Sequence, residues 1–129
     1  MALNILVVDD SAVTRAMIIK TLRVSGIDVG EVHEATNGRA GLEELSRHWV
    51  DLAFVDINMP VMNGEEMINQ VRENPLWANL PIIVVSTEGS QTRIERLQQK
   101  GAHFVHKPFS PEAVREIVNQ IIGVAHEPN

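Results

Sequence analysis

The sequence predicts an α/β fold in which a five-stranded parallel sheet is covered by helices on both faces. Short apolar runs, bounded by turn or polar residues, alternate along the chain with segments of helical periodicity. This alternation favours parallel pairing, because right-handed crossovers return the chain to the same edge of the sheet. With 129 residues, the chain has the length of one domain that can bury a core without disulfides.

Five segments fit the strands of this sheet. The apolar runs are Leu3–Val8, Val50–Val55 and Pro81–Val85, and two weaker candidates are Val29–Ala35 and Ala102–Val105.

Each strand is followed by a helical pattern. The segments are Ser11–Val24, Gly38–Arg47, Glu65–Arg72, Ser90–Gln99 and a last helix behind Ser110 with Pro111 at its first position. Gly26 is expected to close the first helix. The fourth helix has only Ile94 and Leu97 as large apolar residues, so we expect it to be the least firmly packed and a candidate for movement.

Composition excludes several classes of protein. The absence of cysteine fits a reducing compartment, and a net charge of -6 without a basic run argues against nucleic-acid binding. No apolar stretch approaches the roughly 20 residues that span a bilayer, and no signal peptide precedes the first strand. We therefore expect a cytoplasmic protein with no membrane insertion.

Polar side chains follow the predicted strands at their carboxyl ends, where ligands bind in open α/β sheets. Asp9 and Asp10 follow the first strand, Asp56 the third, Ser86 the fourth and Lys107 the fifth. A dinucleotide site is the obvious alternative. It fails because the first turn, in VVDDSAVTRA, has no glycine where a pyrophosphate needs close approach.

Three carboxylates that meet at one edge need a cation to compensate their repulsion. Oxygen ligands without cysteine or clustered histidine favour Mg²⁺, or Mn²⁺, over zinc. A carboxylate such as Asp56 can act as a nucleophile toward phosphorus and form an acyl phosphate. Lys107 would neutralise the phosphoryl oxygens, and the hydroxyl of Ser86 would donate to one of them.

Taken singly, these residues have ordinary explanations. Asp10 or Ser11 can cap the first helix, Asp56 can form a turn, and Lys107 can be a solvated charge. Their joint placement at one edge favours the functional interpretation, because independent turn residues would not gather complementary groups there.

Four motifs give the chain a resemblance to a known family. They are VVDDS, FVDINMPVMNG at Phe54–Gly64, VVSTEG at Val84–Gly89 and HKPF at His106–Phe109. In order and spacing they resemble the receiver domain of two-component response regulators. The resemblance covers essentially the whole chain, so residues 1–129 are expected to form a single receiver domain with no output domain. It implies a flavodoxin-like sheet with strand order 2-1-3-4-5.

The resemblance implies the metal and phosphate chemistry residue by residue. Asp56 matches the phosphoacceptor, and Asp9 and Asp10 match the acidic pair that binds Mg²⁺ together with Asp56 and the backbone carbonyl of Asn58. Lys107 matches the family lysine, followed by a cis peptide bond to Pro108.

The resemblance also implies a switch. Ser86 matches the switch hydroxyl, and Phe104 occupies the position of the switch aromatic, which is often tyrosine. Asn58 and Glu88 occupy positions that tune hydrolysis of the acyl phosphate. Gly64 matches a glycine after the acceptor loop and is expected to have a positive φ.

The stand-alone chemotaxis members are the most similar in pattern. This implies a histidine kinase as donor and a downstream protein, the flagellar switch or another target, as partner. The partner is expected to bind the face of the fourth helix, last strand and last helix, including Phe104 and the helix around Ile94 and Leu97. We expect a monomeric signalling domain that is not an enzyme, beyond assisting its own phosphotransfer and autodephosphorylation.

Other functions remain open at this stage. A phosphorelay intermediate would pass its phosphoryl group to another histidine. A small phosphohydrolase with Asp56 as nucleophile would need a second acid two residues later, where Asn58 stands. A degenerate scaffold is disfavoured by the intact set of acidic, hydroxyl and lysine residues.

The five histidines have no metal-ligand spacing on a helix. We expect all five to be surface residues without a metal: His33, His48, His103, His106 and His126. His106 is expected beside the site.

Overall fold

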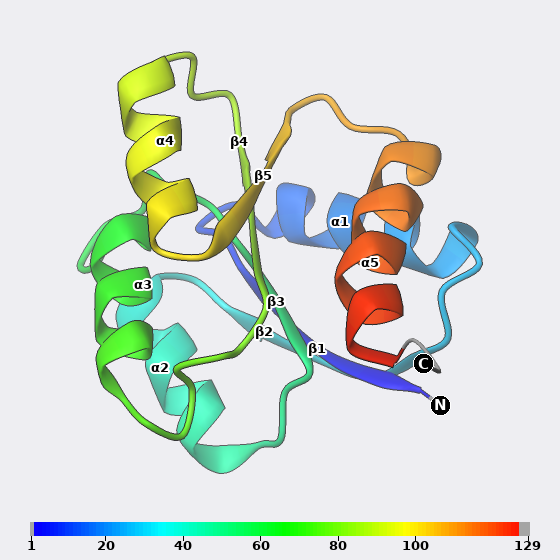
Figure 1. Cartoon of the computed structure of the whole chain (residues 1–129), viewed down its shortest axis with the longest axis horizontal. Coiled ribbons are helices and arrows are strands. Elements are labelled where there is room, and N and C mark those ends of the chain that lie inside the picture. The colour runs from blue at the N-terminus through cyan, green and yellow to red at the C-terminus, as the bar shows by residue number, and fades with distance from the viewer. Residues whose placement is uncertain (1, 127–129) are drawn as a thin grey trace.

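The computed structural model describes residues 2–126, with side chains described up to Ile122, and strands and helices alternate throughout (Figure 1). The strands are β1 (Leu3–Val8), β2 (Val29–Ala35), β3 (Leu52–Val55), β4 (Ile82–Ser86) and β5 (Ala102–His106). The helices are α1 (Ala12–Val24), α2 (Gly38–Arg47), α3 (Gly64–Glu73), α4 (Gln91–Gln99) and α5 (Pro111–His126).

All neighbouring strands pair in parallel, in the order β2-β1-β3-β4-β5. This confirms the predicted fold class and strand order. The bounds differ by one or two residues at β3, β4 and β5, where the predicted runs began early or stopped short. Such shifts are ordinary, because an apolar run marks burial and pairing decides where a strand ends.

Two apolar cores lie on opposite faces of the sheet. Figure 1 shows α2, α3 and α4 on one side and α1 and α5 on the other. Alternate residues of one strand feed the two cores: Leu6 and Val8 belong to the first, and Ile5 and Val7 to the second. The central strands are covered on both sides, which explains their continuous apolar sequences.

Side-chain caps define where the helices begin. Ser11 accepts a hydrogen bond from the backbone N–H of Thr14 at 3.2 Å, so Ser11 caps α1 and Asp10 does not. Asn63 and Glu66 form a reciprocal capping box at the start of α3. Gly26 follows α1 with φ +88°, as expected for a glycine that closes a helix.

Helix α4 buries only Ile94 and Leu97, as predicted, and its movement stays a prediction. A charged contact supplements this small apolar surface. The Glu65 carboxylate of α3 accepts hydrogen bonds from Arg96 and Lys100, and the Arg96 bond above all lowers the pKa of Glu65 to about 2. Because both apolar residues face the core, α4 presents most of its other side chains at the surface.

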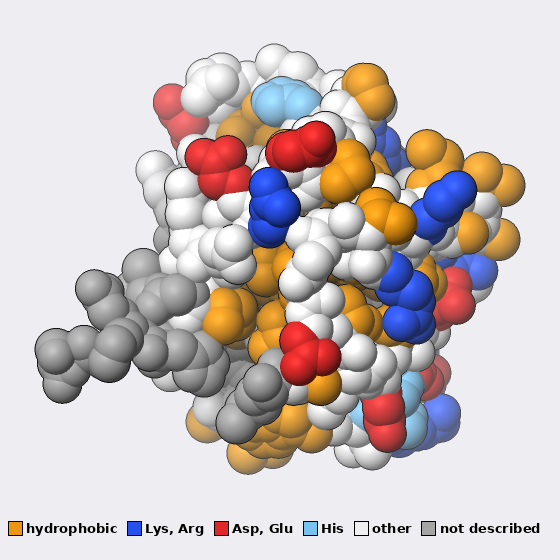
Figure 2. Space-filling model, turned by 90° about the vertical axis from the view of Figure 1, so that its right-hand side faces the viewer, with side chains coloured by type: hydrophobic (Ala, Val, Ile, Leu, Met, Phe, Trp, Pro, Cys, Tyr) orange, Lys and Arg blue, Asp and Glu red, His pale blue; other side chains and the backbone are white. Residues whose placement is uncertain are grey.

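The surface charges and the helix lengths relate to two classes that the composition disfavours, nucleic-acid-binding proteins and membrane proteins. Figure 2 shows the side covered by α1 and α5, where Lys and Arg side chains are spread among acidic ones without a continuous basic patch on this face. Among the described residues, no helix has the length and apolar character to cross a membrane. The cytoplasmic location stays a prediction.

The prediction of a positive φ at Gly64 is wrong. In the described chain the non-glycine residue with a left-handed backbone is Val61, at φ 68°, and the glycines are Gly26 and Gly101. Glycine is required at position 64 for close approach instead, since a Cβ there would overlap the carbonyl oxygen of Asp56. The predicted cis peptide bond between Lys107 and Pro108 is present.

We expect Gly64→Ala to lower the free energy of unfolding by about 1–3 kcal/mol, because the new methyl group meets rigid backbone. Urea denaturation measures the effect. Gly89→Ala is the matched control, since Gly89 has an ordinary φ and no atom lies within 4 Å of the position that its Cβ would take. Equal stabilities of the two variants would contradict the steric role of Gly64.

Candidate functional site

Three aspartates converge at the carboxyl edge of the sheet, as the sequence predicts. Asp9 and Asp10 follow β1, and Asp56 follows the adjacent strand β3. The N–H of Asp56 donates to the carbonyl of Val8 at 2.9 Å, which fixes the two strand ends side by side. One carboxylate oxygen from each aspartate lies within 4.8 Å of the other two. This oxygen cluster suits a hard divalent cation.

Burial makes the cluster electrostatically costly. Asp9 is 2% exposed and Asp56 is 8% exposed, while Asp10 is exposed to solvent. Burial raises the pKa of Asp56, the positive charge of Lys107 opposes this, and the charges of Asp9 and Asp10 raise the pKa further. A cation bound among these oxygens would offset their excess negative charge.

Lys107 places a positive charge beside the acidic cluster. Its Nζ atom lies 3.4 Å from Oδ2 of Asp9 and 3.8 Å from Oδ1 of Asp56. The backbone N–H of Lys107 donates to the carbonyl of Ser86 at 3.0 Å, so the end of β5 is held against the end of β4. The lysine therefore lies where the sequence predicts.

Sequence reasoning missed Arg15. Its Nη1 atom donates to the backbone carbonyl of Asp9 at 2.7 Å, and its Nε atom donates to the Glu34 carboxylate at 2.8 Å. This arginine ties α1, the end of β1 and β2 together behind the acidic pair. The signal in the sequence was an arginine one turn after the Ser11 cap, a position that points back toward the strand end.

The loop after β4 links the site to α4. Ser86 is 1% exposed, and its Oγ atom accepts the backbone N–H of Glu88 at 3.1 Å. The Glu88 carboxylate accepts hydrogen bonds from the Ser90 N–H and from Nη1 of Arg93, both at 3.0 Å. Glu88 is therefore held by the start of α4 in this state. Asn58 is exposed next to the acceptor strand.

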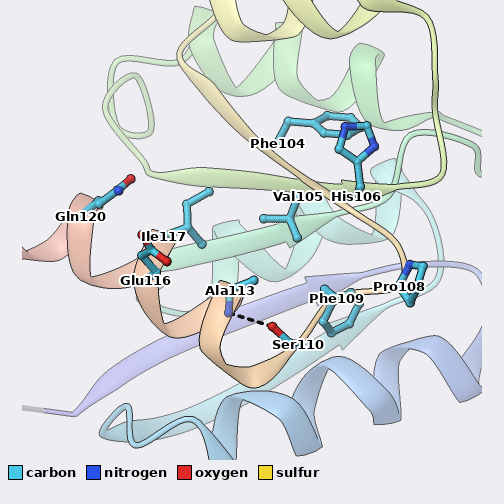
Figure 3. Close-up of a pocket in the computed structure, with 10 residues that line it drawn as sticks. All are labelled: Phe104, Val105, His106, Pro108, Phe109, Ser110, Ala113, Glu116, Ile117 and Gln120. Carbon is cyan, nitrogen blue, oxygen red and sulfur yellow. Dashed lines mark hydrogen bonds between the residues drawn. The ribbon is translucent and has the colours of Figure 1, made fainter.

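Phe104 is half-buried on β5, paired in register with Val84. Its ring packs edge-on against His106 with the ring centroids 4.6 Å apart. Figure 3 shows both rings on one side of β5 and Val105 on the other, beside a pocket that Ile117 of α5 also lines. His106 lies at the end of β5 beside the site, as expected.

The expectation that all five histidines are surface residues is wrong for His33. The His33 side chain is only 15% exposed and stacks on His48. These rings lie with Glu31, a grouping that a search for helix spacing cannot find because the side chains come from a strand and a helix. His103 is exposed, and the side chain of His126 lies outside the described residues.

An open parallel sheet with this strand order, and with acids and a lysine at its carboxyl edge, is the arrangement of phosphoacceptor signalling domains. The family model of the response regulator receiver domain matches residues 5–119. The chain therefore belongs to the response regulator receiver family, whose members are signalling domains and not classical enzymes.

Known relatives span the chain almost completely. A chemotaxis protein CheY homolog of Campylobacter jejuni is 34% identical over 123 residues, which cover 94% of this chain and 93% of the relative. The two-component response regulator ORR3 of rice is 36% identical, and the match covers 92% of this chain and 90% of the rice protein. Among solved structures, one chain of the CheX-CheY-BeF3-Mg complex from Borrelia burgdorferi matches with a TM-score of 0.82 and 25% sequence identity. The match covers 93% of this chain and 89% of the chain in the complex.

The raised pKa of Asp56 predicts a pH-dependent stability in metal-free buffer. Between pH 3.8 and the raised pKa, the folded state keeps a proton that the unfolded state has released, so Asp56 reduces stability as the pH rises through this window. We expect Asp56→Asn to melt at a higher temperature than the wild type at neutral pH, with the difference shrinking toward pH 3.8.

Thermal melts from acidic to neutral pH measure this difference. Glu43→Gln removes an exposed carboxylate on α2 and is the matched control, which should melt close to the wild type at neutral pH. Mg²⁺ should stabilise the wild type more than Asp56→Asn. A variant that is less stable than the wild type throughout would contradict the electrostatic cost of Asp56.

Proposed function

We propose that this chain is a phosphorylation-controlled switch in which Asp56 accepts a phosphoryl group from a histidine kinase. The observation that carries the proposal is the convergence of three carboxylates and Lys107 at one sheet edge, with Asp56 and Asp9 buried. Burial raises the pKa of Asp56, and a cation bound beside it would favour the ionised carboxylate that attacks phosphorus. The proposed domain is the whole chain, residues 1–129.

In the proposed transfer, an oxygen of Asp56 attacks the phosphorus of a phosphohistidine or of a small acyl phosphate. The new bond is the P–O bond of an aspartyl phosphate. The bond that breaks is the P–N or P–O bond to the donor, and its electron pair leaves with the donor. Asp9, Asp10, Asp56 and the backbone carbonyl of Asn58 would hold Mg²⁺, or Mn²⁺, which supplies charge neutralisation for the phosphoryl oxygens when bound.

Two side chains would recognise the product. The Nζ atom of Lys107, already 3.8 Å from Asp56, would pair with a phosphoryl oxygen. Ser86 accepts one hydrogen bond through Oγ, and its O–H is left to donate to another phosphoryl oxygen. Asn58 and Glu88 would set how quickly water hydrolyses the acyl phosphate, and Glu88 would first have to exchange its bonds to Ser90 and Arg93.

Phosphorylation would change the conformation of the surface formed by α4, β5 and α5. Movement of Ser86 shifts the β4–α4 loop, because Glu88 joins Ser86 to the first turn of α4. Space vacated there would let Phe104 turn inward from its half-buried position. A downstream protein would bind this altered face, and the chain would act as a monomer.

Chemotaxis is the pathway that we propose, with the flagellar switch or a similar protein as target. The CheY homolog of Campylobacter jejuni supports it, although the rice regulator is as similar in sequence. The alternative is a relay intermediate that returns its phosphoryl group to a second histidine. Incubation of the phosphorylated chain with a histidine phosphotransfer domain separates the two roles, since only a relay intermediate would transfer onward rapidly.

We expect acetyl phosphate with Mg²⁺ to add a single phosphoryl group to the wild type and none to Asp56→Asn. Intact mass spectrometry measures the adduct. Omission of Mg²⁺ should abolish it, because the developing charge on the phosphoryl oxygens then lacks its counterion.

Asp51→Asn is the matched control for this experiment. Asp51 is an aspartate at the opposite end of β3, where it accepts the backbone N–H of Asn4 at 2.8 Å. Its variant should form the adduct as the wild type does. An adduct that persists in Asp56→Asn, in a folded protein, would contradict the assignment of the acceptor.

We expect beryllium fluoride with Mg²⁺, a stand-in for the phosphoryl group, to shift backbone amide signals along α4, β5 and the start of α5. The reason is that the rearrangement at Ser86 must reach this face to control a partner. Two-dimensional ¹H–¹⁵N NMR of the wild type measures the shifts, and Asp56→Asn should show none. Shifts confined to the loops around Asp9 and Asp56 would show that the site does not communicate with the face.

A further inference from the structure

A second group of possible metal ligands lies away from the acidic edge, between β2 and α2. Glu31 and His33 are two residues apart on β2 and share one face of that strand, and His48 caps the C-terminal end of α2 four residues after Glu44. An oxygen of Glu31 and one ring nitrogen from each of His33 and His48 lie within 4.8 Å of one another.

The chemistry of these side chains differs from that of the acidic edge. Two imidazoles and a carboxylate form the ligand set of three-residue zinc sites, in which a water completes the tetrahedron. Imidazole ligands favour transition metals, whereas Mg²⁺ prefers oxygen alone. Bonds of 2.0–2.1 Å place neighbouring ligands of a tetrahedral zinc about 3.3 Å apart. Nε2 of His33 and Oε1 of Glu31 are already 3.1 Å apart.

We propose that Glu31, His33 and His48 bind one Zn²⁺ ion, and that Glu44 orients the His33 ring. The Oε1 atom of Glu44 lies 3.8 Å from Nδ1 of His33 and 3.8 Å from Nε2 of His48. These nitrogens therefore face a carboxylate, which is the usual partner of the ring N–H of a zinc-bound histidine. For His33 this leaves Nε2, the nitrogen nearest Glu31, to bind the metal.

Binding requires one ring to turn. The His33 and His48 rings are stacked with centroids 3.8 Å apart and planes 16° apart, so their in-plane lone pairs do not meet at one point. His33 is 15% exposed and held between two glutamates, whereas His48 is 39% exposed at the C-terminal cap of α2. His48 is the ring that turns, and zinc converts the stacked pair into a converging pair.

Zinc titration followed by isothermal calorimetry, with Mg²⁺ in excess to occupy the acidic edge, tests the proposal. We expect one zinc per chain in the wild type, and an affinity at least about tenfold lower in His48→Ala and in His33→Ala. His103→Ala removes an exposed histidine of β5 and should bind as the wild type does. Asp10→Asn should also keep the affinity, because the proposed site shares no residue with the acidic edge.

NMR of the imidazole rings distinguishes metal binding from a purely structural role, because only a bound metal changes the ring signals when zinc is added. Zinc should shift the ring signals of His33 and His48 and leave those of His103 unchanged. Circular dichroism without zinc shows whether each variant is folded. Wild-type zinc affinity in folded His48→Ala and His33→Ala, or loss of binding in Asp10→Asn, would overturn the proposal and leave the group as paired histidine and glutamate side chains.

Discussion

Repulsion among carboxylates at the ends of β1 and β3 is the constraint on which the rest of this molecule depends. Asp9 and Asp56 are removed from water by the sheet, and the structure holds them near each other and near Asp10. Buried carboxyl groups that lie close together tend to keep their protons unless a positive charge lies beside them. The chain supplies part of it with Lys107 and leaves the remainder to a cation or to a proton on Asp56.

Main-chain contacts maintain this arrangement. The N–H of Asp56 is fixed on the carbonyl of Val8, and the N–H of Asp9 is fixed on the carbonyl of Ala35. Gly64 then allows α3 to begin against the carbonyl of Asp56, where a larger residue would not fit. Arg15 anchors the carbonyl of Asp9 from the α1 side. Rigid backbone thus holds side chains that would otherwise move apart.

Much of this could be predicted from the sequence, because the determining signals are local. Leu3–Val8 is a continuous apolar run that ends in two aspartates, and Ser11 starts a helix directly afterwards. Strand order followed from the family resemblance, and the convergence of Asp9, Asp56 and Lys107 followed from the rule that parallel strands end at one edge.

The misses share a different cause, since each depends on contacts between residues that are not neighbours in the sequence. Gly64 was expected to need an unusual φ, but its constraint is the carbonyl of Asp56 at the other end of the same β3–α3 loop. His33 and His48 meet only when β2 packs against α2, because one lies on the strand and the other caps the helix. Val50 is buried and apolar, yet β3 begins only at Leu52, because burial precedes the point where pairing starts.

The contact between α3 and α4 depends on charge as well as on apolar packing. Helix α4 buries two apolar side chains, and Glu65 reaches Arg96 and Lys100 across the gap. Attraction between partly exposed charges weakens as ions accumulate, with a screening length of about 8 Å at physiological ionic strength. Part of what holds α4 against α3 is therefore sensitive to the salt concentration of the solution.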